Sequence, residues 1–201
     1  MHIDRALAQL SEIHAQVLRG AVYRGYSART CGLTAGIALL AAAAQEGLLP
    51  DLAPEGFALY WSVLALACAA LFVADALRGR GACAESFQRT LTVVLQLLPA
   101  LAVGAALPWV LLRVGLDAWP LLPGLWCTVF GLGVLASRPY LPRAIGWVGL
   151  YYLLTGGVLL LAAQPASVSA WSVGVPFACG QAASALVLWI HLERGAWERR
   201  A

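Results

Sequence analysis

The chain has 201 residues, of which 61% are hydrophobic and only 11% are charged, and its mean hydropathy is +0.78. Soluble domains carry roughly a quarter charged residues, so this chain has too few charges to cover a globular surface in water. The net charge of +3 comes from scattered arginines, which excludes an extended basic patch for nucleic acid. We therefore expect a protein that lies in a lipid bilayer.

The first residues, MHIDRALAQLSEIHAQVLRG, are less apolar than the rest of the chain. Their apolar positions recur in alternating steps of four and three, at Ile3, Leu7, Leu10, His14 and Val17. This heptad spacing predicts an amphipathic helix whose narrow stripe binds another helix. We expect a cytoplasmic helix that contacts a second copy or a partner protein. Docking on the chain's own loops and binding to the membrane surface are open alternatives, and no cleaved signal peptide is expected.

A segment rich in tyrosine and arginine joins this helix to the first apolar span. Its members are Arg19, Tyr23, Arg24, Tyr26 and Arg29. Such residues are typical of anchors at the headgroup level. An alternative is a binding site for an anionic lipid or a phosphate.

Six segments are long and apolar enough to cross a membrane, which takes about 20 residues per helix. They are residues 31–49, 57–77, 90–112, 119–136, 145–163 and 171–192. Each is continuously apolar rather than alternating, which indicates helices. We predict an all-α integral membrane bundle of six transmembrane helices within residues 30–192. The amphipathic and juxtamembrane segment occupies residues 1–29, and a cytoplasmic tail occupies residues 193–201.

The arginines predict the orientation of this bundle, because cytoplasmic loops carry an excess of basic residues. They gather in every second connecting segment, at Arg5, Arg19, Arg24, Arg29, Arg78, Arg80, Arg89, Arg138, Arg143, Arg194, Arg199 and Arg200. The segments between them are acidic or neutral, with Arg113 balanced by Asp117. We therefore expect both termini to face the cytoplasm.

Tryptophans and small residues support the same arrangement. Six tryptophans lie near span ends, where rings settle at the headgroup level: Trp109, Trp119, Trp147, Trp171, Trp189 and Trp197. Small residues spaced by four occur as Gly32 with Gly36, Ala65 with Ala69, Ala100 with Gly104, and Gly180 with Ser184. Such pairs let helix backbones approach closely in lipid. We expect them to pack helices within one chain rather than between copies.

Ionisable residues are rare inside the spans. Asp75 and Arg78 lie at the end of the second span, one turn apart, where they can form an ion pair. His191 and Arg194 occupy the matching end of the sixth span. We expect an interfacial ion pair and a histidine at the headgroup level here, and a lipid-modifying enzyme that uses this cluster is one alternative function.

Two amides, Gln96 and Gln181, are the candidate polar path through the membrane. Amides that bond across helices are common in membrane bundles and need no substrate. If they line a cavity instead, they predict a carrier or channel for a small neutral or lipophilic solute.

Motifs for catalysis and for cofactors are missing. The chain has no GxSxG, no HExxH, no P-loop and no dinucleotide fingerprint. No second histidine within a span could complete a haem site, and the five cysteines show no CxxC spacing. We expect no metal and no cofactor, and the pattern disfavours an enzyme.

The order of elements resembles a group of uncharacterised bacterial six-span membrane proteins. The shared features are the amphipathic opening, YRGYS after Arg19, six short-looped spans and the closing GQAASALVLWIHLER. The resemblance implies no activity. We expect a non-enzymatic inner-membrane protein that acts as an interaction or accessory subunit of a membrane assembly.

Overall fold

The computed structural model describes residues 27–78, 84–163 and 168–193, and all regular structure in these ranges is helical. The α-helices are α2 (Ala28–Leu48), α3 (Pro54–Arg78), α4 (Ala84–Val114), α5 (Leu122–Ala136), α6 (Ile145–Leu161) and α7 (Trp171–Leu188). The predicted all-helical bundle is confirmed for this part of the chain. The predicted N-terminal seam (Ile3, Leu7, Leu10, His14, Val17) lies outside the described residues.

Within the described ranges, five helical segments are long and apolar enough to cross a membrane: Ala28–Leu48, Pro54–Asp75, Leu95–Val114, Asp117–Ala136 and Trp171–His191. α6 is apolar but has only 17 residues. At a rise of about 1.5 Å per residue it is about 26 Å long, near the lower limit for a span. The chain thus has the helices of a membrane protein, and a sixth crossing by α6 stays a prediction.

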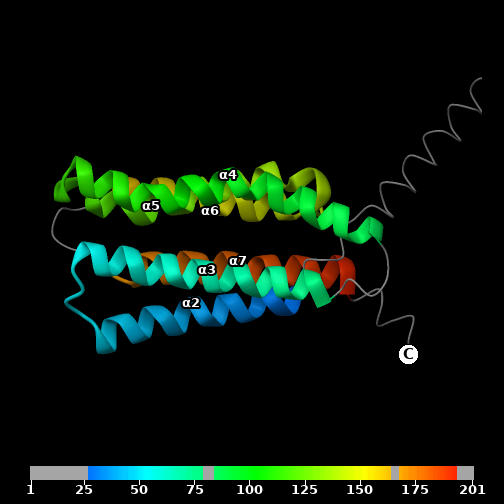
Figure 1. Cartoon of the computed structure of the whole chain (residues 1–201), viewed down its shortest axis with the longest axis horizontal. Helices are drawn as coiled ribbons and strands as arrows, with labels where there is room; N and C mark the ends of the chain where they lie inside the picture. Colours follow the sequence, from blue (N-terminus) through cyan, green and yellow to red (C-terminus); the bar gives the residue numbers. More distant parts are fainter. Residues whose placement is uncertain (1–26, 79–83, 164–167, 194–201) are drawn as a thin grey trace, which may run out of the picture.

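The helices form two layers, with α4, α5 and α6 in one and α2, α3 and α7 in the other (Figure 1). Within the layers, the most extensive contacts join α5 to α6 and α2 to α7. The layers meet where α7 packs on α6 and α5, and where α3 meets α4. α2 begins and α7 ends at the same end of the bundle.

Glycines bring the backbones of α5 and α6 together. A Cβ atom at Gly131 would lie 3.0 Å from the carbonyl oxygen of Gly149, and one at Gly124 would lie 3.0 Å from that of Gly156. The two glycines of each helix are seven residues apart, so they lie on one face and form a continuous seam. Lipid provides no hydrophobic force between helices, so this close approach and its dispersion contacts stabilise the pair.

A proline in α4 determines one bond between α4 and α5. α4 continues through Pro108, which has no N–H group and leaves the carbonyl of Gly104, four residues earlier, without its helical donor. Trp126 of α5 donates its indole Nε1–H to this oxygen at 2.8 Å. The bond satisfies a carbonyl that has no water to bind inside a membrane.

Short segments of other helix types follow several α-helices. Gly115 ends α4 with φ 140°, a conformation essentially restricted to glycine. The 3₁₀ segment η2 (Leu116–Leu121) then leads into α5, and η3 (Arg138–Tyr140) lies between α5 and α6. The π-helical segment η4 (Trp189–Glu193) extends α7.

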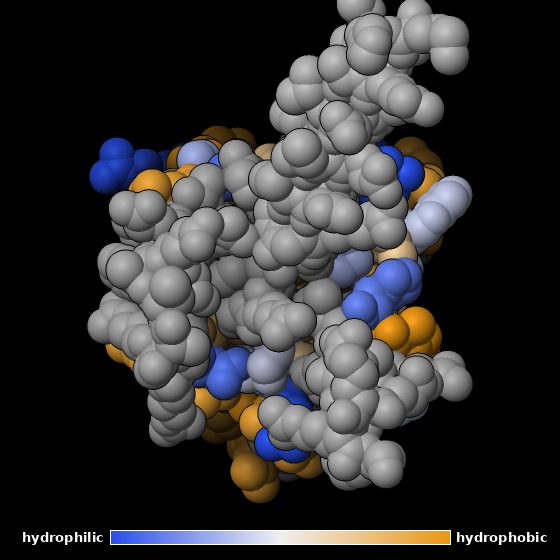
Figure 2. All heavy atoms as spheres, turned by 90° about the vertical axis from the view of Figure 1, so that its right-hand side faces the viewer, coloured by the Kyte–Doolittle hydropathy of each residue, from blue (hydrophilic) through white to orange (hydrophobic). Residues whose placement is uncertain are grey.

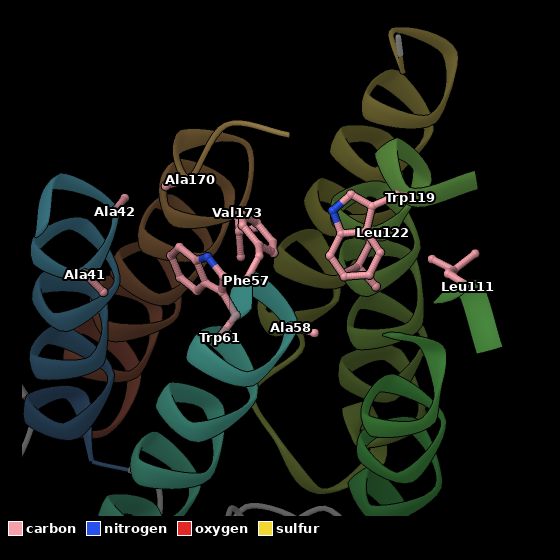
Figure 3. Packing of buried hydrophobic residues seen from close by; sticks show 10 residues of the cluster. All are labelled: Ala41, Ala42, Phe57, Ala58, Trp61, Leu111, Trp119, Leu122, Ala170 and Val173. Carbon is pink, nitrogen blue, oxygen red and sulfur yellow. The ribbon is translucent and has the colours of Figure 1, made fainter. Parts of the chain in front are cut away.

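An aromatic cluster closes the bundle at the end where α2 finishes (Figure 3). Phe57 lies 6.0 Å from Trp119 between ring centroids, edge to face, and 6.2 Å from Trp61. The prediction of Trp119 as a headgroup anchor is wrong, because only 7% of this side chain is exposed. η2 folds back at this end and directs the indole toward α3.

A second aromatic group joins the two layers. Tyr152 of α6 is fully buried between Phe130 of α5 and Phe177 of α7, at centroid distances of 5.0 and 5.5 Å. Its hydroxyl donates to the Phe177 carbonyl at 3.3 Å. A Cβ atom at Gly180 would collide with the Tyr152 ring, so glycine is needed there for α6 and α7 to meet.

α3 and α4 contribute least to the interior. In the most apolar part of α3 only 17% of the residues are buried, and in that of α4 only 11%, against 39% for α2, α5 and α7. Hydrophobic side chains also lie at the rim of the bundle in the end-on view of Figure 2. These outer surfaces are suited to lipid.

Candidate functional site

The amide of Gln181 lines a small cavity between α4, α5, α6 and α7. Its volume is about 30 Å³, which is room for about one water molecule. Thr34 donates its hydroxyl to the Cys31 carbonyl at 3.0 Å and lies 3.5 Å from Gln181 Oε1, so its contact with the amide is the weaker one. Pockets for drug-sized ligands measure roughly 300–1,000 Å³, and this cavity is far smaller.

Gln96 of α4 differs from Gln181. Its Oε1 atom is buried and has no hydrogen-bond partner among the described residues. The next residue, Leu97, lines the cavity at Gln181. No hydrogen bond links the two amides within the part of the chain that the structure describes, and a solute path through both stays a prediction.

The interfacial cluster divides into two separate sets of contacts. Asp75 accepts a hydrogen bond from the Thr30 hydroxyl at 2.8 Å, which joins the end of α3 to the start of α2. Ser27 caps α2 by accepting from the Thr30 backbone N–H at 3.2 Å. His191 Nδ1 lies 2.8 Å from the Val187 carbonyl of its own helix, and since a carbonyl only accepts, Nδ1 carries the hydrogen.

Other members of the predicted sites cannot be placed. The side chain of Arg78 and all of Arg194 lie outside the described residues, so acid–base chemistry at this cluster stays a prediction. The same holds for the anionic-lipid contact, whose members Arg19, Tyr23, Arg24 and Tyr26 are not described. Arg29 is exposed in the first turn of α2.

A polar cluster at the other end of α2 was not foreseen from the sequence. Trp61 of α3 donates its indole N–H to Gln45 Oε1 at 2.7 Å, and Tyr60 donates its hydroxyl to the Ala41 carbonyl at 2.8 Å. Gln45 is 5% exposed. The only sequence signal for this cluster is a polar residue at the margin of one span opposite two aromatic residues of the next.

Glu46 follows Gln45 and binds the start of α7. Its Oε1 atom accepts from the Ser169 hydroxyl at 2.6 Å and from the Ala170 backbone N–H at 2.9 Å. A carboxylate at a helix N-terminus satisfies free N–H groups and the helix dipole. A hollow of about 170 Å³ opens beside it, lined by Gln45, Glu46, Leu49, Pro50, Val168 and Ser169.

The pair Gly32 and Gly36 faces away from the rest of the bundle. A Cβ atom at either position would meet no atom within 4 Å among the described residues, and both are exposed. Within the described residues this pair has no packing partner, so its packing inside one chain stays a prediction. α2 packs on α7 with its opposite face, including Ala35, Ala38 and Ala42.

The other glycines predicted to pack do lie at contacts. Gly104 lies beside Trp126, its pair Ala100 packs against Gly133 of α5, and Gly180 packs against Tyr152. The outward direction of Gly32 and Gly36 therefore distinguishes them from the internal packing positions.

The chain matches no model of a known protein family, no curated protein and no solved structure. Within the described ranges, no group of three or more His, Cys, Asp and Glu side chains is placed to hold a metal ion.

Proposed function

We propose that this protein is a non-enzymatic subunit of a membrane assembly that associates through the outer face of α2. The observation that carries the proposal is the uncovered pair Gly32 and Gly36. A glycine inside a helix destabilises it by about 0.5–1 kcal/mol relative to alanine. Close packing accounts for this cost at Gly131 and Gly180, but nothing in the described bundle accounts for it on the outside of α2.

Two glycines four residues apart provide a shallow groove for another helix. The partner backbone can approach there closely enough for dispersion contacts and Cα–H···O bonds. Two exposed leucines, Leu33 and Leu40, lie along one side of the groove and supply apolar surface there. This is the geometry of a helix–helix contact in lipid.

We also propose that all six helices cross the bacterial inner membrane, with both termini in the cytoplasm. Arg29, Arg138 and Arg143 belong to the end where α2 begins, whereas Glu46 and Asp51 belong to the opposite end. This distribution favours a cytoplasmic position for the first end. The predicted N-terminal helix would then provide a second contact with the partner on the cytoplasmic side.

The association is tested by the size of the complex in native membranes. The protein is cross-linked in its own membrane, extracted in mild detergent and separated by native electrophoresis. We expect a species larger than the monomer, which Gly32→Leu and Gly36→Leu reduce strongly, because the leucine side chain fills the groove. Gly157→Leu is the matched control, since Gly157 of α6 also has open space beside it among the described residues.

Two outcomes would contradict the proposal. One is a wild-type protein that is recovered only as a monomer. The other is an oligomer that the α2 variants leave intact or that Gly157→Leu reduces equally. Deleting residues 1–20 measures the separate contribution of the N-terminal helix. We expect this deletion to weaken the complex.

A further inference from the structure

The hollow beside Gln45 and Glu46 is distinct from the outer face of α2. It is formed by the last turn of α2, the loop that follows it and the residues before α7. Its volume of about 170 Å³ exceeds the space for a single water. It is smaller than the roughly 300 Å³ at which drug-sized pockets begin, so a ligand here must be small.

The orientation of the Gln45 amide is determined by Trp61. An indole N–H can only donate a hydrogen bond, so the amide oxygen must face Trp61, at 2.7 Å. The two N–H groups of the amide nitrogen then have no hydrogen-bond acceptor among the described residues. Gln45 is 5% exposed and lines the hollow. The hollow is therefore lined by a largely buried side chain whose amide N–H groups have no acceptor among the described residues.

Only one of the two carboxylate oxygens of Glu46 accepts hydrogen bonds from described residues. Both of its hydrogen bonds, to Ser169 and to the Ala170 N–H, end on Oε1, and none in the described structure uses Oε2. The surroundings are acidic, because Asp51, Glu55 and Asp117 lie at this end against the single basic residue Arg113 among the described residues. A cation is therefore favoured over an anion in this hollow.

We propose that the hollow binds an ethanolammonium unit, which is a primary ammonium group with an oxygen atom two carbons away. The ammonium donates to Glu46 Oε2, and the oxygen of the ligand accepts from the Gln45 amide nitrogen. The methylene groups contact the apolar walls at Leu49, Pro50 and Val168. The unit comes either from a phosphatidylethanolamine headgroup, since the hollow lies at the end of a span, or from a free amine.

The two sources are separated by thermal unfolding. For the free amine, the protein in detergent is titrated with ethanolammonium chloride, and choline chloride is the control because its quaternary nitrogen has no N–H. At ten times the dissociation constant we expect Tm to rise by about 3–5 °C with ethanolammonium only. For the lipid, we expect Tm in phosphatidylethanolamine nanodiscs to exceed that in phosphatidylcholine nanodiscs, with no further rise on adding free ethanolammonium. An equal rise with choline, or no rise in either arm, would overturn the proposal.

Glu46→Gln is the decisive variant. Its amide oxygen can still accept from the start of α7, but the negative charge is lost, so we expect the ligand-dependent shift in Tm to disappear. Glu55→Gln is the matched control, because Glu55 is a carboxylate at the same end that does not line the hollow. A shift that persists in Glu46→Gln, or that is lost equally in Glu55→Gln, would refute a specific site.

A second variant tests the same site in case Glu46→Gln fails to fold. Val168→Phe fills the hollow without removing any hydrogen bond of Glu46 or Gln45. We expect it to abolish the shift while the protein without ligand unfolds near the wild-type temperature. Retention of the shift in this variant would place the ligand elsewhere.

Discussion

The bond between Trp126 and the Gly104 carbonyl offers the sharpest test of how α4 and α5 are joined. Trp126→Phe removes the donor at 2.8 Å and leaves the carbonyl without a partner, because Pro108 supplies no N–H. Pro108→Ala restores the N–H that belongs to this carbonyl in a regular α-helix. The two substitutions are therefore coupled through a single oxygen atom.

The magnitude follows from what each variant removes. An unsatisfied carbonyl away from water costs about 1–3 kcal/mol, and the smaller phenyl ring loses about 1 kcal/mol of packing. Trp126→Phe alone should therefore lower the free energy of unfolding by about 2–4 kcal/mol. When Pro108→Ala is present, only the packing loss remains. The interaction energy of the double-mutant cycle should be about 1–3 kcal/mol.

The assay is unfolding of the four proteins of this cycle in mild detergent, by heat and by denaturant. At about 2–4 °C per kcal/mol, Trp126→Phe should lower Tm by several degrees in the native background and much less beside Pro108→Ala. Trp147→Phe is the control, because the Trp147 side chain is 74% exposed. Equal losses in both backgrounds, within about 0.5 kcal/mol, would refute the idea that Trp126 replaces the missing N–H.

Three further substitutions test other contacts by the same unfolding assay. Gly131→Ala should lower the free energy of unfolding by about 1–2 kcal/mol despite the better helix propensity of alanine, because backbone atoms of α6 occupy the space of the added methyl group. Gly157→Ala should be neutral or stabilising, and equal Tm values for the two variants would argue against the glycine seam. Trp61→Phe should cost about 1–3 kcal/mol by leaving the Gln45 oxygen without its donor; a Tm change as small as that of an exposed-site control would exclude this. Thr30→Val should cost about 1 kcal/mol by removing the bond that joins α2 to the end of α3, and an unchanged Tm would contradict it.

The coarse fold could be predicted because it depends on composition. Runs of apolar residues of about the length of a span require helices in lipid, and the structure has helices there. Helix ends that depend on local chemistry differ from the predicted ranges. α4 begins at Ala84 rather than near residue 90, and α5 is preceded by a 3₁₀ segment from Leu116 where one span was predicted from 119.

The direction of a face could not be predicted from the sequence. The pairs Gly32 with Gly36 and Gly180 with Ser184 have the same spacing, yet one faces outward and the other packs against Tyr152. In a soluble helix the polar residues would have marked the outer face, but a helix in lipid is apolar on all sides. Which side is internal then depends on the neighbouring helices.

The polar bonds that position the candidate ligand site are also long-range. Gln45 meets Trp61, and Glu46 meets Ser169, which is more than one hundred residues away in the chain. Glutamine and glutamate at the end of a span are ordinary in sequence, because such residues are usually solvated there. The capping role of the Glu46 carboxylate becomes visible only in the fold, where α7 begins beside the end of α2.

α2 is held by its inner face and by both of its ends, which has a consequence for association. Thr30 binds Asp75 at one end, Gln45 binds Trp61 at the other, and Glu46 binds the start of α7. Ordering a flexible helix on binding would consume part of the interaction energy, whereas a helix that is already fixed avoids that loss. The outer face with its two glycines is therefore a preorganised surface. If this reasoning holds, Thr30→Val should weaken the complex measured by cross-linking although Thr30 lies off that face, and an unchanged complex would show that α2 needs no such support.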